Sequence, residues 1–240
     1  MHTPKKYFTL SFDDGVTQDT RLLEILRKHN AYCCTFNINT GLFGVRMDWV
    51  AEACNCPGLS HLRYTEEQMR SGIYDGFELA VHTLTHPALN SFDDEPDKIA
   101  YEINTDADNI ESICGIYPTG MAYPGGDFCV SDRTVEILRE RTKMKYARFT
   151  TPTYGFDIPK DFMRWYPTCW FFDERCFELA EQFISAPMDR DMLFYVWGHG
   201  YEMDIIGEKA YSDFERFIIM MKDSGVEMLT NREIYEELKK

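Results

Sequence analysis

The chain has 240 residues, of which 44% are hydrophobic and 27% are charged, a composition typical of one domain with a substantial core. The formal net charge of -15 argues against a nucleic-acid or anionic-membrane partner, because either partner requires a basic surface. The sequence lacks the run of about 18 apolar residues that would predict a transmembrane helix. Residues 1–10 lack the apolar segment and cleavage site of an export signal, so we expect a cytoplasmic protein.

Short β-branched or aromatic runs alternate with amphipathic stretches, and neither a linker nor an internal repeat divides the chain. Strands are expected at Phe8–Phe12, Cys34–Ile38, Phe77–Val81, Gly120–Tyr123, Lys145–Phe149, Leu193–Trp197 and Val226–Leu229. Helices are expected at Thr20–Lys28, from the Thr65 cap to Gly72, at Asp97–Cys114, from the Ser131 cap to Thr142, and at Cys176–Ser185, Tyr211–Ser224 and Asn231–Lys239. We therefore expect a single domain that spans residues 1–240.

The alternation of strands and helices predicts an α/β fold with a mainly parallel sheet and helices outside it. About seven strands in a chain of this length favour a (β/α) barrel over an open sheet, although periodicity alone is compatible with both. In either architecture the catalytic groups gather at the carboxyl ends of the strands.

Polar side chains stand at the ends of several predicted strands. Asp13 and Asp14 end the first strand, His82 and His86 follow the third, and His199 follows the sixth. Three of the six histidines of the chain therefore fall on one predicted face, together with two adjacent carboxylates.

His82 and His86 are four residues apart, and in a helical turn their rings would face the same way and chelate one cation. Pro87 disfavours the α conformation at His86, so a tight turn fits the sequence equally well. Two imidazoles and one carboxylate are typical of a catalytic zinc site or a non-haem iron site. Two unrelated polar loop residues are the alternative, which the similar strand ends disfavour.

Neighbouring residues of a strand point to opposite sides, so Asp13 and Asp14 cannot both face one pocket in a regular strand. Gly15 allows the chain to turn at this point. One aspartate can then bind a metal while the other reaches a water next to it. A capping pair of aspartates on a loop is the simpler alternative.

The segments "SFDDG", "HTLTH", "AYPGG" and "VWGHG", in this order and spacing, resemble the polysaccharide deacetylase family, the chitooligosaccharide and peptidoglycan deacetylases. The resemblance extends from Phe8 to about His199. It implies a distorted (β/α) barrel that holds one divalent metal, usually Zn²⁺, with Co²⁺, Ni²⁺, Mn²⁺ or Fe²⁺ as alternatives.

The resemblance also implies a role for each matching residue. Asp14, His82 and His86 would be the metal ligands. Asp13 would be the general base, and His199 would be the general acid that protonates the leaving amine. The metal would lower the pKa of a bound water and polarise the amide carbonyl.

Four further residues take expected roles from the same motifs. The backbone N–H of Gly125 would help to hold the oxyanion. Trp197 would line the acetyl pocket, and Tyr123 and Pro124 would contact the substrate.

The third motif departs from the family pattern. Ala122 stands where an arginine usually orients the general base, and Gly125 stands where a tyrosine is usual. We expect Arg164 to replace the missing arginine, with Arg148 as the less favoured alternative. Nor is the family motif with the aspartate that orients the acid histidine recognisable. Three residues are equal candidates for this second role: Asp157, Asp161 and Asp173.

The leading hypothesis is a metal-dependent hydrolase of non-peptide amide bonds that deacetylates an N-acetylated sugar or oligosaccharide. The atypical third motif and the missing export signal favour a second hypothesis, hydrolysis of a small cyclic amide or ureido compound. A non-catalytic carbohydrate-binding protein is the third hypothesis, and the oligomeric state is left open. A second metal at Cys54, Cys56 and His61 is disfavoured, because the cysteine spacing is atypical and a fourth ligand is missing.

Overall fold

A single parallel sheet organises the molecule. The computed structural model describes residues 3–239. Its strands are β1 (Lys6–Asp14), β2 (Cys34–Ile38), β3 (Glu78–Val81), β4 (Gly120–Ala122), β5 (Tyr146–Arg148), β6 (Cys169–Trp170), β7 (Met192–His199) and β8 (Glu227–Met228). The order is β5-β4-β3-β2-β1-β7-β6, with β8 paired to β1, and all of these pairings are parallel.

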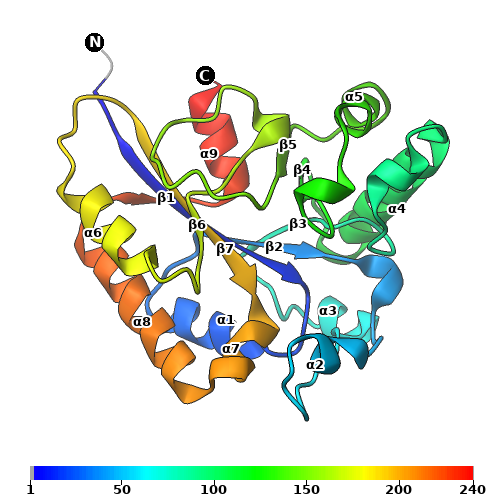
Figure 1. Cartoon of the computed structure of the whole chain (residues 1–240), viewed down its shortest axis with the longest axis horizontal. Coiled ribbons are helices and arrows are strands. Elements are labelled where there is room, and N and C mark those ends of the chain that lie inside the picture. Colours follow the sequence, from blue (N-terminus) through cyan, green and yellow to red (C-terminus); the bar gives the residue numbers. More distant parts are fainter. Residues whose placement is uncertain (1–2, 240) are drawn as a thin grey trace.

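The sheet curls into a partial barrel (Figure 1). Beyond the outer strand β5, Arg148 forms an isolated parallel bridge with Trp165, which precedes the other outer strand, β6, in the chain. The expected α/β fold with a distorted (β/α) barrel is thus confirmed. All seven expected strands are present, and the one that was not predicted, β6, is only two residues long.

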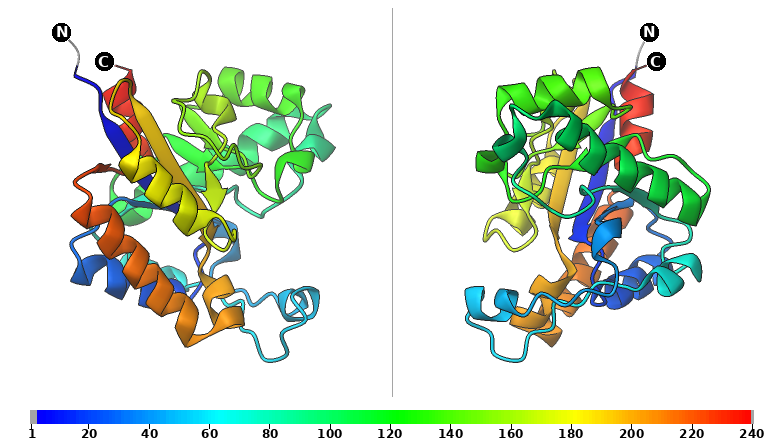
Figure 2. Two further views of the ribbon diagram at one scale, coloured as in Figure 1. Left: turned by 60° about the vertical axis from the view of Figure 1, so that its left-hand side comes forward. Right: turned by 90° about the vertical axis from the view of Figure 1, so that its right-hand side faces the viewer.

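Helices cover the outside of the sheet. They are α1 (Asp19–Lys28), α2 (Trp49–Ala53), α3 (Glu66–Arg70), α4 (Pro96–Cys114), α5 (Asp132–Arg141), α6 (Cys176–Ser185), α7 (Gly200–Ile206), α8 (Glu208–Asp223) and α9 (Asn231–Leu238). Figure 2 shows α4 and α5 on one side of the sheet and α6 and α8 on another. The short helices α2 and α7 were not predicted. No helix in the described part of the chain is both long and apolar enough to span a bilayer.

Strand β1 is buried along its whole length, and its two faces differ. Phe8 and Phe12 belong to the large apolar cluster under the helices, whereas Tyr7 packs in a second cluster with Trp165 and Tyr195. Because side chains alternate along a strand, the Tyr7 face also carries Thr9, Ser11 and Asp13. This polar row leads from the second cluster to the carboxyl end of the strand, where the candidate site lies.

Candidate active site

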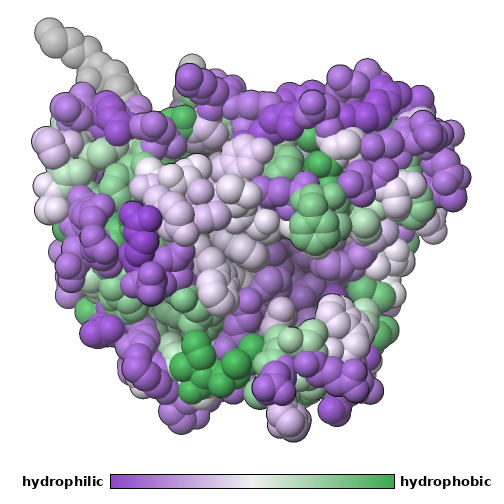
Figure 3. Space-filling model, in the orientation of Figure 1, coloured by the Kyte–Doolittle hydropathy of each residue, from purple (hydrophilic) through white to green (hydrophobic). Residues whose placement is uncertain are grey.

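A cavity of about 750 Å³ lies at the carboxyl ends of the strands. It opens on the face drawn in Figure 3, where a hollow with a hydrophilic floor lies near the centre. The residues that line it include most of those expected from the sequence, namely Asp13, Asp14, His82, His86, Tyr123, Gly125, Trp197 and His199. Pro124 is buried and does not line this cavity, so its expected contact with substrate stays a prediction.

Asp14, His82 and His86 present their ligand atoms to one another. The Oδ1 atom of Asp14 lies 4.0 Å from Nε2 of His82 and 3.9 Å from Nε2 of His86. The ligand atoms of the three residues all lie within 4.8 Å of one another. They are the only such group of histidines, cysteines and acids found within residues 3–239. Two imidazole nitrogens and a carboxylate oxygen fit a divalent transition metal.

Left-handed backbone conformations bring these three side chains together. Asp14 has φ 80° and Gly15 has φ 64°, so the chain turns at the end of β1 and the side chain of Asp14 joins the pocket that Asp13 faces. His86 has φ 59° and its N–H donates to Oγ1 of Thr83 at 3.0 Å. The segment is therefore a tight turn rather than a helical turn, which agrees with the restriction that Pro87 places on His86.

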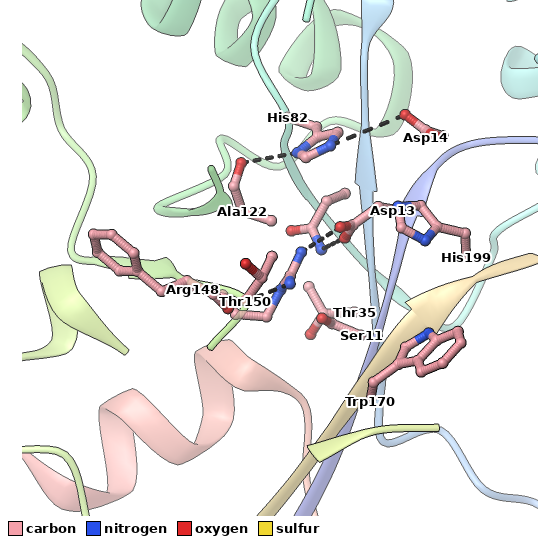
Figure 4. Close-up of polar contacts among 12 residues, drawn as sticks. Ser11, Asp13, Asp14, Thr35, His82, Ala122, Arg148, Thr150, Trp170 and His199 are labelled. Atoms are coloured by element: carbon pink, nitrogen blue, oxygen red, sulfur yellow. Dashed lines mark hydrogen bonds and ion pairs between the residues drawn. The ribbon is translucent and has the colours of Figure 1, made fainter. Parts of the chain in front are cut away.

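Both imidazoles are held neutral and His82 is fixed in one orientation. The Nδ1–H of His82 donates to the carbonyl oxygen of Ala122 at 2.8 Å, which leaves Nε2 free to accept a metal (Figure 4). Burial lowers the pKa of His82 to about 4 and also lowers the pKa of His86. Neutral imidazoles are the form that binds metals.

Asp13 lies beside this triad with its own buried partners. Its Oδ2 forms an ion pair with Nη2 of Arg148 (Figure 4). Its Oδ1 accepts from Nδ2 of Asn37 at 2.9 Å. Burial alone would raise the pKa of Asp13, but the Arg148 guanidinium, together with His82 and His199, more than offsets it and the pKa falls below its ordinary value. Asp13 is therefore an ionised carboxylate at neutral pH, a form that can accept a proton.

His199 ends β7 directly beside Asp13 of β1, which is its partner in the parallel register. Its Nδ1 lies 3.1 Å from Oε1 of Glu202, which also accepts from Nε1 of Trp170 at 2.9 Å through Oε2. Burial would lower the pKa of His199, but Glu202, followed by the carboxylates of Asp14 and Asp13, raises it to about 9. The imidazole is thus protonated at neutral pH and able to donate a proton.

Replacing Glu202 by glutamine is expected to lower the pKa of His199 by at least about one unit, because the variant loses a carboxylate within hydrogen-bonding distance of the ring. NMR titration of the metal-free protein would measure this pKa. Glu208→Gln, which removes an exposed carboxylate paired with Arg21, is the matched control and should leave the value unchanged. An unchanged His199 pKa in Glu202→Gln would show that Glu202 does not hold the proton.

A cleft with three metal-ligand candidates, an ionised carboxylate and a protonated imidazole at the ends of parallel strands has the parts of a metal-assisted hydrolase. The sequence profile of the polysaccharide deacetylase family matches residues 1–147, more than half of the chain. The chain belongs to this family.

Solved structures agree with the family fold. The peptidoglycan deacetylase PdaC from Bacillus subtilis has a TM-score of 0.56 at 20% identity, with 100% of this chain and 94% of that chain covered. A family 4 carbohydrate esterase from Streptomyces lividans in complex with acetate has a TM-score of 0.52 at 14% identity, covering 92% and 90%. A CE4-family pseudoenzyme from Bacillus anthracis has a TM-score of 0.57 at 17% identity, covering 98% and 66%. At these identities the likeness concerns the fold, and a search of curated proteins finds no match.

An arginine of the neighbouring strand makes the contact with Asp13 that was expected of the arginine missing from the third motif. Ala122 of β4 is the register partner of Arg148 of β5, so an arginine at either position can reach the same pocket. The guanidinium of Arg148 pairs with Asp13 and also lies 4.4 Å from the ring centre of Trp197, which lines the cavity.

The expectation for Arg164 was wrong as regards its position. This side chain pairs with Asp132 at 2.6 Å and lies 3.8 Å from Asp161, and neither contact involves Asp13. Arg164 ends a short helical turn, Phe162–Arg164, whereas Arg148 ends strand β5. The less favoured alternative, Arg148, is the residue that contacts Asp13.

Glu202 occupies the position expected for an aspartate beside the acid histidine. The three candidates named from the sequence have other partners: Asp157 pairs with Arg190, Asp161 with Arg139, and Asp173 accepts from Tyr154. Glu202 is close because it stands three residues after His199, in the first turn of α7. Its closeness to His199 in the sequence makes Glu202 a candidate for the site, although such a residue is more often loop surface. A capping residue followed three positions later by glutamate is a known helix-start pattern, and this signal favours Glu202.

Two other residues of the third motif line the cavity. Gly125 lines the cavity with φ 73°, a conformation that a tyrosine at this position would adopt only with strain. Tyr123 also lines it, but its hydroxyl donates to the carbonyl oxygen of Met163 at 3.0 Å. The contact of Tyr123 with substrate stays a prediction, and its hydroxyl already has a partner within the protein.

Several supporting residues were not identified from the sequence. Asp106 of α4 accepts from the backbone N–H of His82 at 3.2 Å and from Thr40, which fixes the start of the histidine turn. His61 and Arg63 both contact Asp14. His61 is thus turned toward the triad, and it forms no candidate metal cluster with Cys54 and Cys56 among residues 3–239.

Proposed function

We propose that this protein is a metal-dependent amidohydrolase that removes acetyl groups from an N-acetylated sugar or oligosaccharide. The observation that carries the proposal is the convergence of Asp14, His82 and His86 on one point, with Asp13 and His199 on neighbouring strands beside them. Membership of the polysaccharide deacetylase family supports the choice of an acetylated sugar as substrate.

A divalent cation bound by Asp14, His82 and His86 would activate water and polarise the amide carbonyl. Zn²⁺ is the proposed ion, because two imidazole nitrogens and one carboxylate oxygen match its preferred ligands. The side chain of His86 is 32% exposed while that of His82 is 2% exposed, so solvent and substrate reach the triad from the His86 side.

The protein side chains would carry the proton transfers. Asp13, held ionised by Arg148, accepts the proton of the attacking water. His199, held protonated by Glu202, donates a proton to the nitrogen as the C–N bond breaks, because an amine is a poor leaving group without one. The backbone N–H of Gly125 is the proposed donor to the developing oxyanion.

The proposal predicts that the protein stripped of metal by a chelator has no deacetylase activity, and that equimolar Zn²⁺ restores it. Release of acetate from N-acetylglucosamine oligomers would be measured. Asp14→Asn should bind Zn²⁺ at least about tenfold more weakly, because it loses the charged ligand. Asp94→Asn, an exposed acid outside the cleft, is the matched control and should behave as the wild type.

Three results would overturn the proposal. One is acetate release that is unaffected by chelation or by Asp14→Asn. Another is turnover of cyclic amides or ureido compounds without turnover of N-acetylated sugars, which would support the alternative substrate class. The third is glycan binding without any hydrolysis by the zinc-loaded protein, which would support a non-catalytic role.

A further inference from the structure

Asp14 carries two buried contacts that the reaction outlined above does not use. Nε2 of His61 donates to its Oδ2 at 3.0 Å, and Nη2 of Arg63 donates to its Oδ1 at 2.8 Å. The side chains of His61 and Arg63 are each only 3% exposed, so both contacts are shielded from solvent.

The backbone fixes both residues beside Asp14. The segment that contains them crosses the turn after β1, with Arg63 in an antiparallel bridge to Val16. The N–H of Tyr64 donates to the carbonyl oxygen of Gly15 at 3.1 Å, and the N–H of Thr17 donates to that of Leu62 at 2.8 Å. His61 and Arg63 are thus built into the same turn that aims Asp14 at the triad.

His61 and Arg63 contact different oxygens of Asp14 and therefore affect it differently as a metal ligand. His61 binds Oδ2, and this ring fixes the orientation of the carboxylate without occupying Oδ1. Arg63 binds Oδ1, the oxygen that lies 4.0 Å and 3.9 Å from the imidazoles of His82 and His86. An entering cation would therefore share this oxygen with a guanidinium.

The charges around the site indicate how Arg63 affects the binding of a cation. Arg63 already pairs with Asp14, and Arg148 already pairs with Asp13, so each of the two carboxylates already has a cationic partner before a metal enters. Affinity for a divalent cation rises with the uncompensated negative charge of its ligands, and like charges repel strongly where water is excluded. Arg63 therefore opposes the cation that Asp14 attracts.

We propose that His61 and Arg63 are positioning residues with opposite effects on metal affinity: His61 strengthens binding by orienting Asp14, and Arg63 weakens binding through its charge and keeps the bound cation exchangeable. This inference rests on the proposed metal-dependent function. It concerns the residues around the ligands and not the ligands themselves.

The test is the Zn²⁺ affinity of the metal-stripped 240-residue chain, measured by competition with a chromophoric chelator. Arg63→Gln should bind Zn²⁺ at least about tenfold more tightly than the wild type, because the charge is gone while a donor remains. Arg63→Lys, which keeps the charge, should not bind more tightly. His61→Phe, which keeps the ring but not the donor, should bind about 10- to 100-fold more weakly.

Arg46→Gln is the matched control. It removes an exposed positive charge from the adjoining segment, where Arg46 pairs with Asp48, and should leave the affinity unchanged. If Arg63→Gln does not fold, Arg63→Met gives the same comparison, since it also removes the charge. Absorption of the Co²⁺-loaded proteins should retain one spectral form across the Arg63 variants, which shows that the ligand set is kept.

Damage to the fold would weaken binding in both the His61 and the Arg63 variants, so the opposite signs identify the charge effect. Equal or weaker Zn²⁺ binding by Arg63→Gln, with normal binding by the wild type, would overturn this inference and leave the proposed function standing. Absence of binding by wild type and all variants would overturn both.

Discussion

Replacing Arg148 by methionine is expected to lower the free energy of unfolding by about 3–5 kcal/mol, because it leaves the buried Asp13 carboxylate without its cation. The side chains of Arg148 and Asp13 are 1% and 3% exposed, so water does not replace the lost partner. Urea denaturation at pH 7 would measure the change.

The contribution of the Asp13–Arg148 ion pair to stability should depend on pH. The pKa of Asp13 is below its ordinary value of 3.8 in the folded protein, so the ion pair stabilises the protein above that pH and loses its effect as the pH falls through the folded pKa. The stability difference between wild type and Arg148→Met should therefore be largest near neutral pH and shrink below about pH 4.

Arg164→Met is the matched control for this experiment. It removes an arginine whose side chain is 33% exposed and whose partners are surface carboxylates, so the change in unfolding free energy should be about 1 kcal/mol or less. Similar losses in the two variants would contradict the assignment of Arg148 as the partner of Asp13.

Asp13→Asn is expected to reduce kcat for acetate release by about 10²- to 10⁴-fold, the usual contribution of a general base. An amide cannot accept the proton of water, and Asp13 is not among the three metal-ligand candidates. The stoichiometry of bound Zn²⁺, measured by atomic emission, should therefore remain one per chain. A variant that lost its metal, or that retained kcat within about threefold, would contradict the division of roles between Asp13 and Asp14.

The sequence predicted the architecture well because most strands are short runs rich in apolar and β-branched residues that alternate with amphipathic helical stretches. It missed β6, which has only Cys169 and Trp170, and the short helices α2 and α7. Elements of this length are stabilised mainly by the neighbours that they pack on, and a local pattern contains little of that information.

The ligand triad could be predicted for a similar reason, since its members stand at strand ends and within two short motifs. The partner of Asp13 could not, because it depends on the register that sets Arg148 of β5 beside Ala122 of β4, 26 positions apart in sequence. The spacing of His61 and Arg63 likewise gives no sign that the segment folds back over Gly15. The site residues could be recognised because they stand in short local motifs. The residues that contact them could not, because their positions depend on pairing between distant segments.

Glu202 links the acid of the site to local order in the chain. Its Oε2 accepts from the backbone N–H of His199 at 2.8 Å and its Oε1 lies 3.1 Å from Nδ1 of the same residue, so one carboxylate both starts α7 and is the counter-ion of the imidazole. Fraying of this seven-residue helix would separate the ring from its counter-ion as the first turn opens. Substitutions in α7 that loosen its first turn are therefore expected to weaken the contact between Glu202 and His199 as well as the packing of the helix.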